Sequence, residues 1–255
     1  MANRKFSPDF LKDPTRADRI IREYEKQIVK LFETFKVKIL ELFEITDEGR
    51  THTSIVVEPD VFFALIDRLI EEEVLYPGYT IIDAKTHQAY IQGDRFAGIM
   101  LGAPLEVRRT EWDKIRKLLT EKTKGDFKGV TDETAKRIRA TIGDGILNEV
   151  SAGKIARSIV RDIDSVGIVR ATAMVRTETM KAVNRGIHDR YVGAGLTDED
   201  EEWLTAIDDR TCDECLANDG KTIKEIGERP PLHPNCRCTI IPKIRVPRGD
   251  IEEEE

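Results

Sequence analysis

The sequence predicts a mainly α-helical protein, in which long N-terminal helices and a helical stem carry a small, loop-rich α+β knob at the C-terminal end. Apolar side chains recur at steps of three and four residues from Thr15 to Gly193, which is the period of amphipathic helices. After Gly195, short β-like runs alternate with segments rich in Asp, Gly and Pro, and every cysteine of the chain lies in this last part. A module of this size buries too little apolar surface to be stable alone, so we expect it to need docking, a metal or crosslinks.

The first two helices are expected at residues 15–45 and 59–75. Asp13-Pro14 suits the start of the first helix, because Asp caps free helical amide groups and proline fits the first turn. The second helix is expected to end at Tyr76-Pro77-Gly78, because proline lacks the amide donor that continues a helix and glycine favours a C-terminal cap.

A third helix is expected at residues 82–101 and a fourth at residues 110–123. The third contains Gly93 and Gly98, which indicate close packing or a kink, and it is expected to end at Gly102-Ala103-Pro104. The glycine-containing segment 124–129 is predicted to be a linker. Residues 1–128 would then form an N-terminal helical region.

The stem is expected to contain three more helices. The first begins at Thr131, where a hydroxyl and an acidic first turn suit an N-cap, and runs to about residue 152. The next ends near Ser165, and the last covers residues 166–193.

Two short β-like runs, residues 203–207 and 238–243, are expected in the knob. On this division residues 129–244 form the second domain, and residues 245–255 form an acidic tail.

Composition and charge exclude several classes of protein. No apolar run approaches the length of a membrane span, so no membrane contact is expected. The N-terminus lacks the apolar core of a signal peptide, so the chain is expected to stay in the cytoplasm or in a particle assembled there. The net charge of −7 disfavours a dedicated nucleic-acid binder, although residues 108–139 and 154–190 are net basic and could face DNA instead of simply being solvated. The acidic run Asp198–Glu202 is expected to be solvated.

Four cysteines and one histidine are clustered near the C-terminus, as Cys212-x2-Cys215 and His233-Pro-Asn-Cys236-Arg-Cys238. Thiolates in two closely spaced groups, joined by a short loop, are what a tetrahedral Zn²⁺ site requires. The favoured ligands are Cys212, Cys215, Cys236 and Cys238. His233 would replace one of them or donate a hydrogen bond beside them. Such a zinc would be structural, because four protein ligands leave no open coordination position.

Two other states of the cysteines remain open. Disulfides would crosslink the module if the mature protein lies in an extracellular particle, or in a hyperthermophile, which the Glu/Lys/Arg-rich composition allows. Free thiols that only pack in the core are the third alternative.

The order of the motifs around the cysteines is similar to that of a known family. The chain contains Arg176-Thr-Glu178 on a helix, Asn184-x-Gly186, Trp203, Asp208-Asp-Arg-Thr-Cys212-x2-Cys215, Asp219-Gly220 and Pro230-Pro-Leu-His-Pro-Asn-Cys-Arg-Cys238. Over about residues 130–243 this set resembles the phage Mu F-like head morphogenesis family, the minor capsid proteins of tailed phages and related proviruses.

The resemblance implies a minor head protein that is assembled in the host cytoplasm and lies inside the virion head. Its implied partners are the portal protein or the inner capsid, with packaged DNA as a further partner. It would support procapsid assembly, DNA packaging or ejection, without enzymatic activity and without a small-molecule substrate.

Within the family pattern, Arg176 and Glu178 look like structural anchors that hold the C-terminal module on their helix by buried ion pairs. The candidate partners are Asp208, Asp209 and Arg210. Trp203 is expected in the core, over the cysteine cluster.

Two functions of other classes are weighed against head morphogenesis. A zinc-stabilised DNA-binding module would use the basic helices between Arg108 and Arg190, and its affinity would fall steeply with salt; no residue is assigned to nucleic-acid binding. An enzyme, such as a nuclease or a thiol oxidoreductase, would use the Cys/His cluster. The enzyme is disfavoured, because the sequence shows neither a nucleophile constellation nor the βαβ pattern around a thioredoxin-like Cys-x2-Cys.

Overall fold

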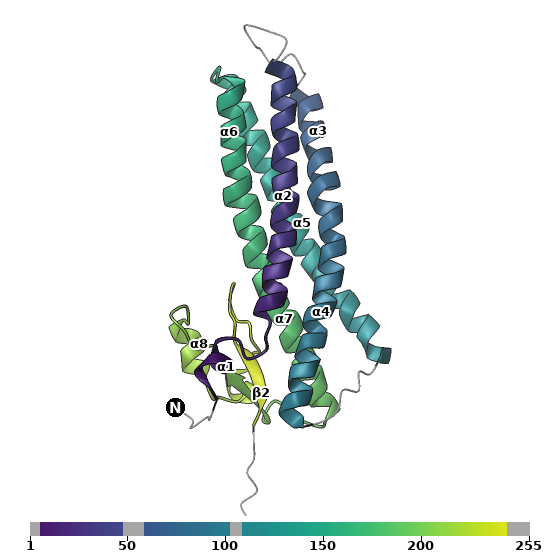
Figure 1. The fold of residues 1–255 in the computed structure, drawn as a ribbon, viewed down its shortest axis with the longest axis vertical. Helices are drawn as coiled ribbons and strands as arrows, with labels where there is room; N and C mark the ends of the chain where they lie inside the picture. Colours follow the sequence, from purple (N-terminus) through teal and green to yellow (C-terminus); the bar gives the residue numbers. More distant parts are fainter. Residues whose placement is uncertain (1–5, 48–58, 103–108, 244–255) are drawn as a thin grey trace, which may run out of the picture.

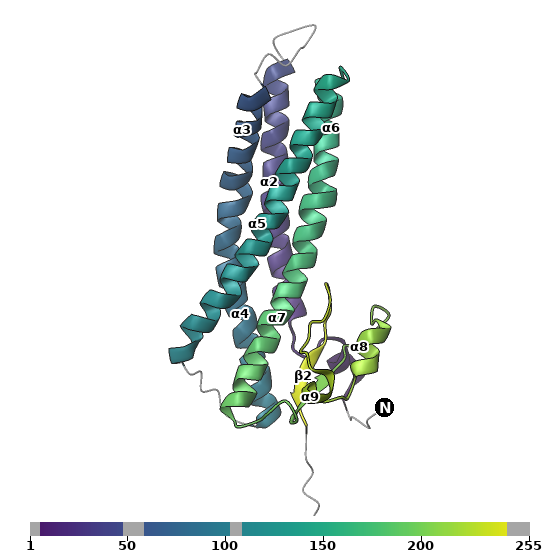
Figure 2. The same ribbon diagram turned by 180° about the vertical axis from the view of Figure 1, so that it is seen from behind.

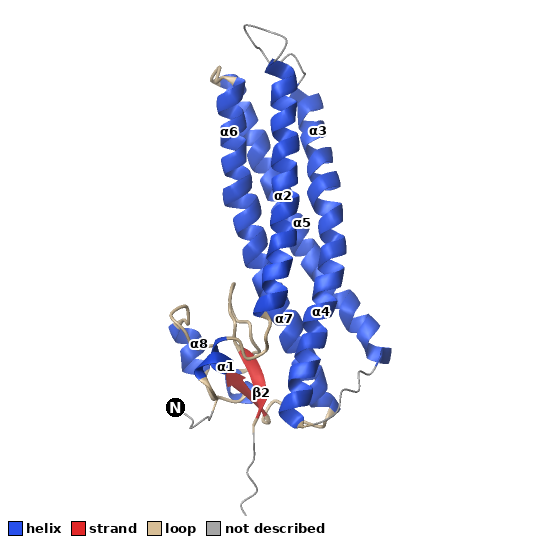
Figure 3. Cartoon of the chain, viewed as in Figure 1, coloured by secondary structure: helices blue, strands red, loops and turns tan. Residues whose placement is uncertain are grey.

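The computed structural model describes residues 6–47, 59–102 and 109–243. An elongated bundle of long helices carries a small knob beside one end (Figure 1), and the knob holds both strands of the described residues (Figure 3). The predicted fold class is confirmed, with a helical stem and a loop-rich α+β knob that contains the Cys/His cluster.

The described residues form the following helices and strands, in chain order. They are α1 (Pro8–Lys12), α2 (Asp18–Asp47), α3 (Pro59–Ile70), the π-helical turn η1 (Glu71–Leu75), α4 (Tyr76–Leu101), α5 (Arg109–Leu147), α6 (Ala152–Asp162), the π-helical turn η2 (Ile163–Ile168), α7 (Val169–Gly193), β1 (Glu201–Leu204), α8 (Asp213–Asn218), α9 (Ile223–Ile226) and β2 (Thr239–Pro242).

The stem consists of α2, the continuous run α3–η1–α4, α5, and the continuous run α6–η2–α7, which alternate in direction (Figures 1 and 2). The apolar stripe of α2 faces the axis of this bundle, because burying such a stripe is what stabilises an amphipathic helix. The stem core contains the buried side chains Tyr24, Ile28, Phe32, Phe35, Ile39, Phe62, Ile66, Val74, Ile82, Phe127, Ile138, Ile142, Ile159 and Val175.

The predicted helix end at Tyr76-Pro77-Gly78 is wrong, because the helix continues through η1 into α4. Proline cannot donate a backbone hydrogen bond, and the wider π-helical turn directly before it accommodates the interruption of the α-helical ladder. Gly78 lies under the ring of Phe127, where an added Cβ would be 2.1 Å from a ring carbon. The sequence signal for a break therefore marks a close contact inside the bundle.

The break expected after Ser165 is also bridged, since η2 joins α6 directly to α7. Gly167 in η2 packs against Phe32, with 2.7 Å between an added Cβ and the ring. Here too a glycine serves close packing within a continuous helical run.

The predicted linker at residues 124–129 is wrong, because α5 runs without interruption from Arg109 to Leu147. Phe127 is fully buried and packs edge-on against Phe32, with 6.4 Å between the ring centroids. Thr131, the predicted N-cap, lies inside the helix and donates its hydroxyl to the Lys128 carbonyl oxygen at 2.8 Å. The domain boundary placed after residue 128 thus lies within α5.

The predicted ends of two other helices are close to the observed ones. The Asp13 carboxylate accepts hydrogen bonds from the amides of Ala17 (2.9 Å) and Asp18 (3.3 Å), so it caps α2 although the helix begins only at Asp18. Gly102 ends α4 in a left-handed conformation with φ of 63°. The sequence analysis did not anticipate α1.

The helices α4 and α7 approach each other so closely that two glycines are required. A Cβ on Gly93 would lie 1.9 Å from the Val183 carbonyl oxygen, and one on Gly186 would lie 2.2 Å from the Tyr90 carbonyl oxygen. Both neighbouring atoms are backbone, which cannot move aside as a side chain can. This crossing, rather than a kink, explains Gly93, and it forms the base on which the knob sits.

The knob is built around a two-stranded antiparallel sheet. Trp203 of β1 pairs with Ile240 of β2, and α8 and α9 lie in the connection between the strands. Both predicted strands are present: β2 lies within the predicted residues 238–243, whereas β1 begins two residues and ends three residues earlier than the predicted run 203–207. A second core cluster joins this sheet to the stem base and contains Ile21, Phe96, Ala97, Val183, Ile187, Tyr191, Trp203, Leu204, Cys215, Cys236, Cys238, Ile240 and Ile241.

Candidate metal centre

The first pair of cysteines is fixed by the start of α8. Cys212 is the N-cap residue, and its sulfur accepts a hydrogen bond from the Cys215 amide at 3.4 Å. Its carbonyl oxygen accepts from the Leu216 amide at 3.0 Å. The x2 spacing within this first turn leaves both sulfurs on the same side of the helix end.

The second half of the cluster is a tight turn from His233 to Cys236. The Cys236 amide donates to the His233 carbonyl oxygen at 3.2 Å, and Asn235 takes a left-handed conformation with φ of 62°. The Asn235 amide donates to the Thr177 hydroxyl of α7 at 3.1 Å, so the turn is attached to the stem. Cys236 follows directly and points into the knob core.

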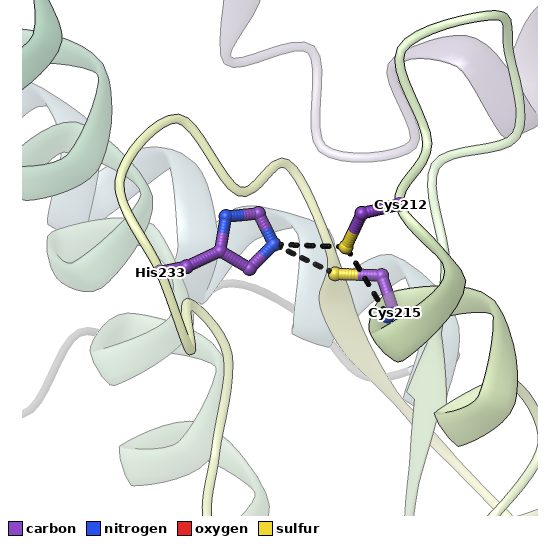
Figure 4. A group of neighbouring side chains, drawn as sticks. All are labelled: Cys212, Cys215 and His233. Atoms are coloured by element: carbon purple, nitrogen blue, oxygen red, sulfur yellow. Dashed lines mark hydrogen bonds between the residues drawn. The ribbon is translucent and has the colours of Figure 1, made fainter.

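The structure brings all five predicted ligands together in two overlapping groups. In the first, the His233 Nε2 atom lies 3.2 Å from the Cys212 sulfur and 3.1 Å from the Cys215 sulfur (Figure 4). In the second, Cys215, Cys236 and Cys238 gather, with 3.7 Å between the Cys215 and Cys236 sulfurs. Within each group the candidate ligand atoms lie within 4.8 Å of one another.

The sulfurs differ in their environments. Burial raises the pKa of the Cys215 thiol to about 12, whereas the hydrogen bond from the Cys238 thiol lowers the pKa of Cys236 to about 5. The same bond raises the pKa of Cys238. The Cys215 amide lowers the pKa of Cys212, since a hydrogen-bond donor stabilises the thiolate.

An ion pair beside the cysteines joins the segment before α8 to the segment before β2. Arg237, between Cys236 and Cys238, binds both carboxylate oxygens of Asp208, and its Nη1 atom lies 2.6 Å from Oδ2. Asp208 also accepts from the Arg210 amide at 2.8 Å. The pKa of Asp208 is held well below its usual range, chiefly by Arg237.

Trp203 is fully buried in the core cluster that includes three of the cysteines, as expected. Its indole N–H donates to the Thr205 hydroxyl at 3.1 Å, and this hydroxyl donates to the Cys215 carbonyl oxygen at 2.7 Å. Trp203 is thus linked to the backbone of Cys215 through the Thr205 hydroxyl.

The ion pairs predicted for Arg176 and Glu178 are wrong. Arg176 of α7 binds Glu25 of α2 at 2.5 Å, and Glu178 binds Lys181 at 2.5 Å. Arg176 therefore joins α7 to α2, whereas the Glu178–Lys181 pair lies within α7. Glu178 contacts α5 as the acceptor of the Thr123 hydroxyl at 3.5 Å. Asp208 pairs within the knob. The resemblance identified the right helix but not its contacts with the knob.

Asn184 is the residue that carries the role expected of Arg176. Its side-chain N–H donates to the Cys238 carbonyl oxygen at 3.0 Å, and its Oδ1 accepts from the Thr239 hydroxyl at 2.8 Å. Asn184 is buried on α7, so it ties the start of β2 to the stem. The motif Asn184-x-Gly186 carried this signal, but its role was not assigned.

A second attachment involves an acidic residue that was expected to be solvated. Glu201 of β1 is fully buried, lies 2.6 Å from the Nδ1 atom of His188 on α7, and accepts from Arg229 at 2.9 Å. The expectation for the run Asp198–Glu202 is wrong at this position. Alternation along β1 turns Glu201 inward, where His188 and Arg229 meet it.

The basic stretches of the stem are extensively paired with acidic neighbours. Examples across helices are Lys124 with Asp83, Arg137 with Asp162, and Arg139 with Asp67. These three cations therefore face acidic neighbours and not a polyanion.

The described helices include none that is both long and apolar enough to pass through a lipid bilayer.

The geometry of the cluster suits a tetrahedral metal ion of the size and softness of zinc. Thiolates about 2.3 Å from one Zn²⁺ lie roughly 3.8 Å apart in a tetrahedral shell, close to the 3.7 Å between Cys215 and Cys236. Five candidate ligands exceed the four positions of such a shell, so a bound ion would be fully coordinated by protein.

Comparison with known proteins supports the motif-based resemblance. Residues 136–241 match the family described as Phage Mu protein F like protein, a family of phage head-morphogenesis proteins. The match begins within α5 and covers α6, α7 and nearly all of the knob. No curated protein matches the chain, and no solved structure matches it.

Proposed function

We propose, from the match of residues 136–241 to a phage head-morphogenesis family, that this protein is a minor capsid component of a tailed phage or provirus, located inside the head. It acts in procapsid assembly through contact with the portal protein or the inner capsid, and it supports DNA packaging or ejection. Its role is structural rather than enzymatic. The family match is the observation that carries this proposal.

The form of the matched segment supports a structural role. Its helices α6 and α7 form one side of the stem, and its knob is attached to α7 through Asn184 and His188. The candidate metal ligands lie within the knob, and a four-ligand shell would leave no open coordination position, which suits a structural role better than catalysis.

The end of the stem remote from the knob offers a surface for a capsid or portal partner. Leu147, at the end of α5, has 82% of its surface exposed, and Ile146 and Val150 beside it are also exposed. Val61 and Leu65 on α3 are exposed apolar residues at the same end. Ile146, Leu147 and Val150 are close in sequence, and exposed apolar side chains that lie close together favour association with a partner.

Co-expression with the capsid and portal proteins of the phage or provirus that encodes this chain tests the proposal. We expect the protein to copurify with procapsids in a few copies, and procapsids assembled without it to package less DNA. Its absence from particles that contain the portal would contradict the proposal.

Two matched variants test the stem end separately. We expect Leu147→Asp to lower incorporation and Ile99→Asp, an exposed apolar residue near the opposite end of the stem, to leave it unchanged. Equal incorporation of both variants would exclude the Leu147 surface as the contact without contradicting the head role.

The zinc-stabilised DNA-binding module stays the alternative. Two observations disfavour it. Trp203 is buried, so its ring is not exposed for stacking on a base, and Lys124, Arg137 and Arg139 pair with carboxylates of the protein. If it were correct, affinity for long duplex DNA would fall by roughly 0.9 log units per neutralised phosphate for each tenfold rise in salt. No binding at low salt would eliminate it.

A further inference from the structure

We infer that the knob contains a structural Zn²⁺ site whose four ligands are Cys212, Cys215, His233 and Cys236, and that Cys238 lies outside the coordination shell. This assignment differs from the four-cysteine set that the sequence favoured. It does not depend on the head-assembly role.

The orientation of His233 is the first argument. Its Nδ1 atom lies 2.9 Å from the Pro234 carbonyl oxygen, which can only accept a hydrogen bond, so Nδ1 carries the proton. In the neutral ring this tautomer leaves the lone pair on Nε2, the atom that faces the sulfurs of Cys212 and Cys215 (Figure 4). A metal-binding imidazole commonly has this arrangement, with one nitrogen donating to a carbonyl and the other directed at the ion.

The backbone gives the second argument, because two turns of equal length present the four ligands. Cys212-x2-Cys215 is closed by the amide-to-sulfur bond of 3.4 Å, and His233-x2-Cys236 by the amide-to-carbonyl bond of 3.2 Å. Cys215 and Cys236 are the last residues of the two turns, and their sulfurs lie 3.7 Å apart. Each turn therefore offers two ligands, and Cys215, which belongs to both ligand groups, links the two turns. One tetrahedral ion would draw Cys236 closer to Cys212 and His233.

Cys238 is held for a different purpose. It directly precedes β2, its carbonyl oxygen is bound by Asn184, and its side chain is only 2% exposed. Its sulfur groups with those of Cys215 and Cys236, and neither Cys236 nor Cys238 groups with Cys212 and His233. The feature that sets Cys238 apart from Cys236 is therefore its place outside the His233-x2-Cys236 turn and its attachment to Asn184. It packs in the knob core beside Cys215 and Cys236.

The site explains how so small a module stays attached to the stem. The turn that carries His233 and Cys236 also carries Asn235, which binds Thr177 of α7, and Cys238, which is bound by Asn184. A metal that joins this turn to the end of α8 fixes both halves of the knob against α7. Ligands from two separate segments convert binding energy into folding energy.

Metal analysis of the full-length chain, purified without chelator from zinc-supplemented medium, tests the inference. We expect one zinc per chain and four reactive thiols after denaturation. Absence of metal together with absence of reactive thiols would show disulfides and overturn the site. Four thiols without metal would overturn it as well.

The variants Cys238→Ser and His233→Ala test the ligand set. We expect Cys238→Ser to retain one zinc per chain and His233→Ala to lose most of it. The reverse pattern would overturn the assignment in favour of four cysteines.

His233→Cys gives a test that does not depend on loss of metal. If His233 is a ligand, this variant keeps the metal, and its cobalt-substituted form gains thiolate-to-cobalt absorption relative to the cobalt-substituted wild type. Unchanged absorption would show that position 233 is outside the shell and overturn the assignment, even if the other variants fail to fold.

Discussion

Asn184, in the middle of α7, donates its side-chain amide to the backbone carbonyl oxygen of Cys238 at 3.0 Å and accepts from the neighbouring Thr239 hydroxyl at 2.8 Å. Both partners are buried. One amide side chain thus satisfies the polar groups at the start of β2, where no water reaches them. This contact joins the candidate metal centre to the stem.

Asn184→Leu should lower the stability of the knob, because it leaves the Cys238 carbonyl and the Thr239 hydroxyl unpaired in the core. Each buried polar group left without a partner costs about 1–3 kcal/mol. Thermal unfolding followed by tryptophan fluorescence measures the loss. The control is Asn148→Leu, at an exposed asparagine that bonds only within its own helix end, and a comparable loss there would count against the interpretation.

Gly93→Ala should destabilise the protein strongly, because its Cβ would lie 1.9 Å from the Val183 carbonyl oxygen and would force α4 and α7 apart. Gly143→Ala is the control, since an added Cβ there meets nothing within 4 Å. The control should gain up to about 1 kcal/mol, the difference in helix propensity between alanine and glycine. Opposite signs in urea unfolding are expected, and a stabilised Gly93→Ala would show that the helices cross less closely.

Phe127→Ala should cost about 3–5 kcal/mol, the usual loss for a fully buried phenylalanine. Its ring fills the space between Phe32 and Gly78, so the cavity would lie in the stem core. Leu118→Ala, on the same helix but with 70% of Leu118 exposed, should change stability by less than about 0.5 kcal/mol. Similar losses for the two would restore the linker interpretation of residues 124–129.

The ion pair between Asp208 and Arg237 should make the knob less stable as the pH falls below about 4. Because Arg237 depresses the pKa of Asp208 in the folded state, the pair contributes fully above the ordinary aspartate pKa of about 3.9. Its contribution is lost as the pH falls below that value toward the folded pKa. The melting temperatures of wild type and Asp208→Asn should therefore differ most at pH 6, and the difference should begin to shrink below about pH 4 and keep shrinking as the pH is lowered further. A difference that stays constant across this range would contradict this origin.

Removal of the inferred zinc should loosen the knob while the stem persists. The apolar core of the stem, around Phe32 and Phe127, does not involve the ligands, whereas the turn at residues 233–238 would lose its crosslink to α8. Hydrogen exchange should rise in residues 205–241 and stay low in α2 after chelation. The same chelator preloaded with zinc is the control, and uniform exchange across the chain would show that stem and knob unfold as one unit.

The sequence alone determined the helical character of the stem and the approximate position of both strands. The spacing of apolar residues along the chain depends on the local backbone conformation, so it can be read without knowledge of the rest of the fold. It also determined the local ligand pairs, since short spacings such as Cys212-x2-Cys215 place neighbouring ligand atoms on their own. The approach of residues 212–215 to residues 233–238 depended on the tertiary structure, through the contacts of Asn235 and Cys238 with α7.

Only the tertiary structure decided whether Pro77 and the segment 124–129 interrupt helices. Whether such a helix continues depends on the packing of Gly78 and Phe127 against distant residues and on a π-helical turn that carries no sequence signature of its own. Arg176 likewise pairs with Glu25 and not with Asp208. The partner depends on which helix packs beside α7, and residue spacing along the chain does not specify that neighbour.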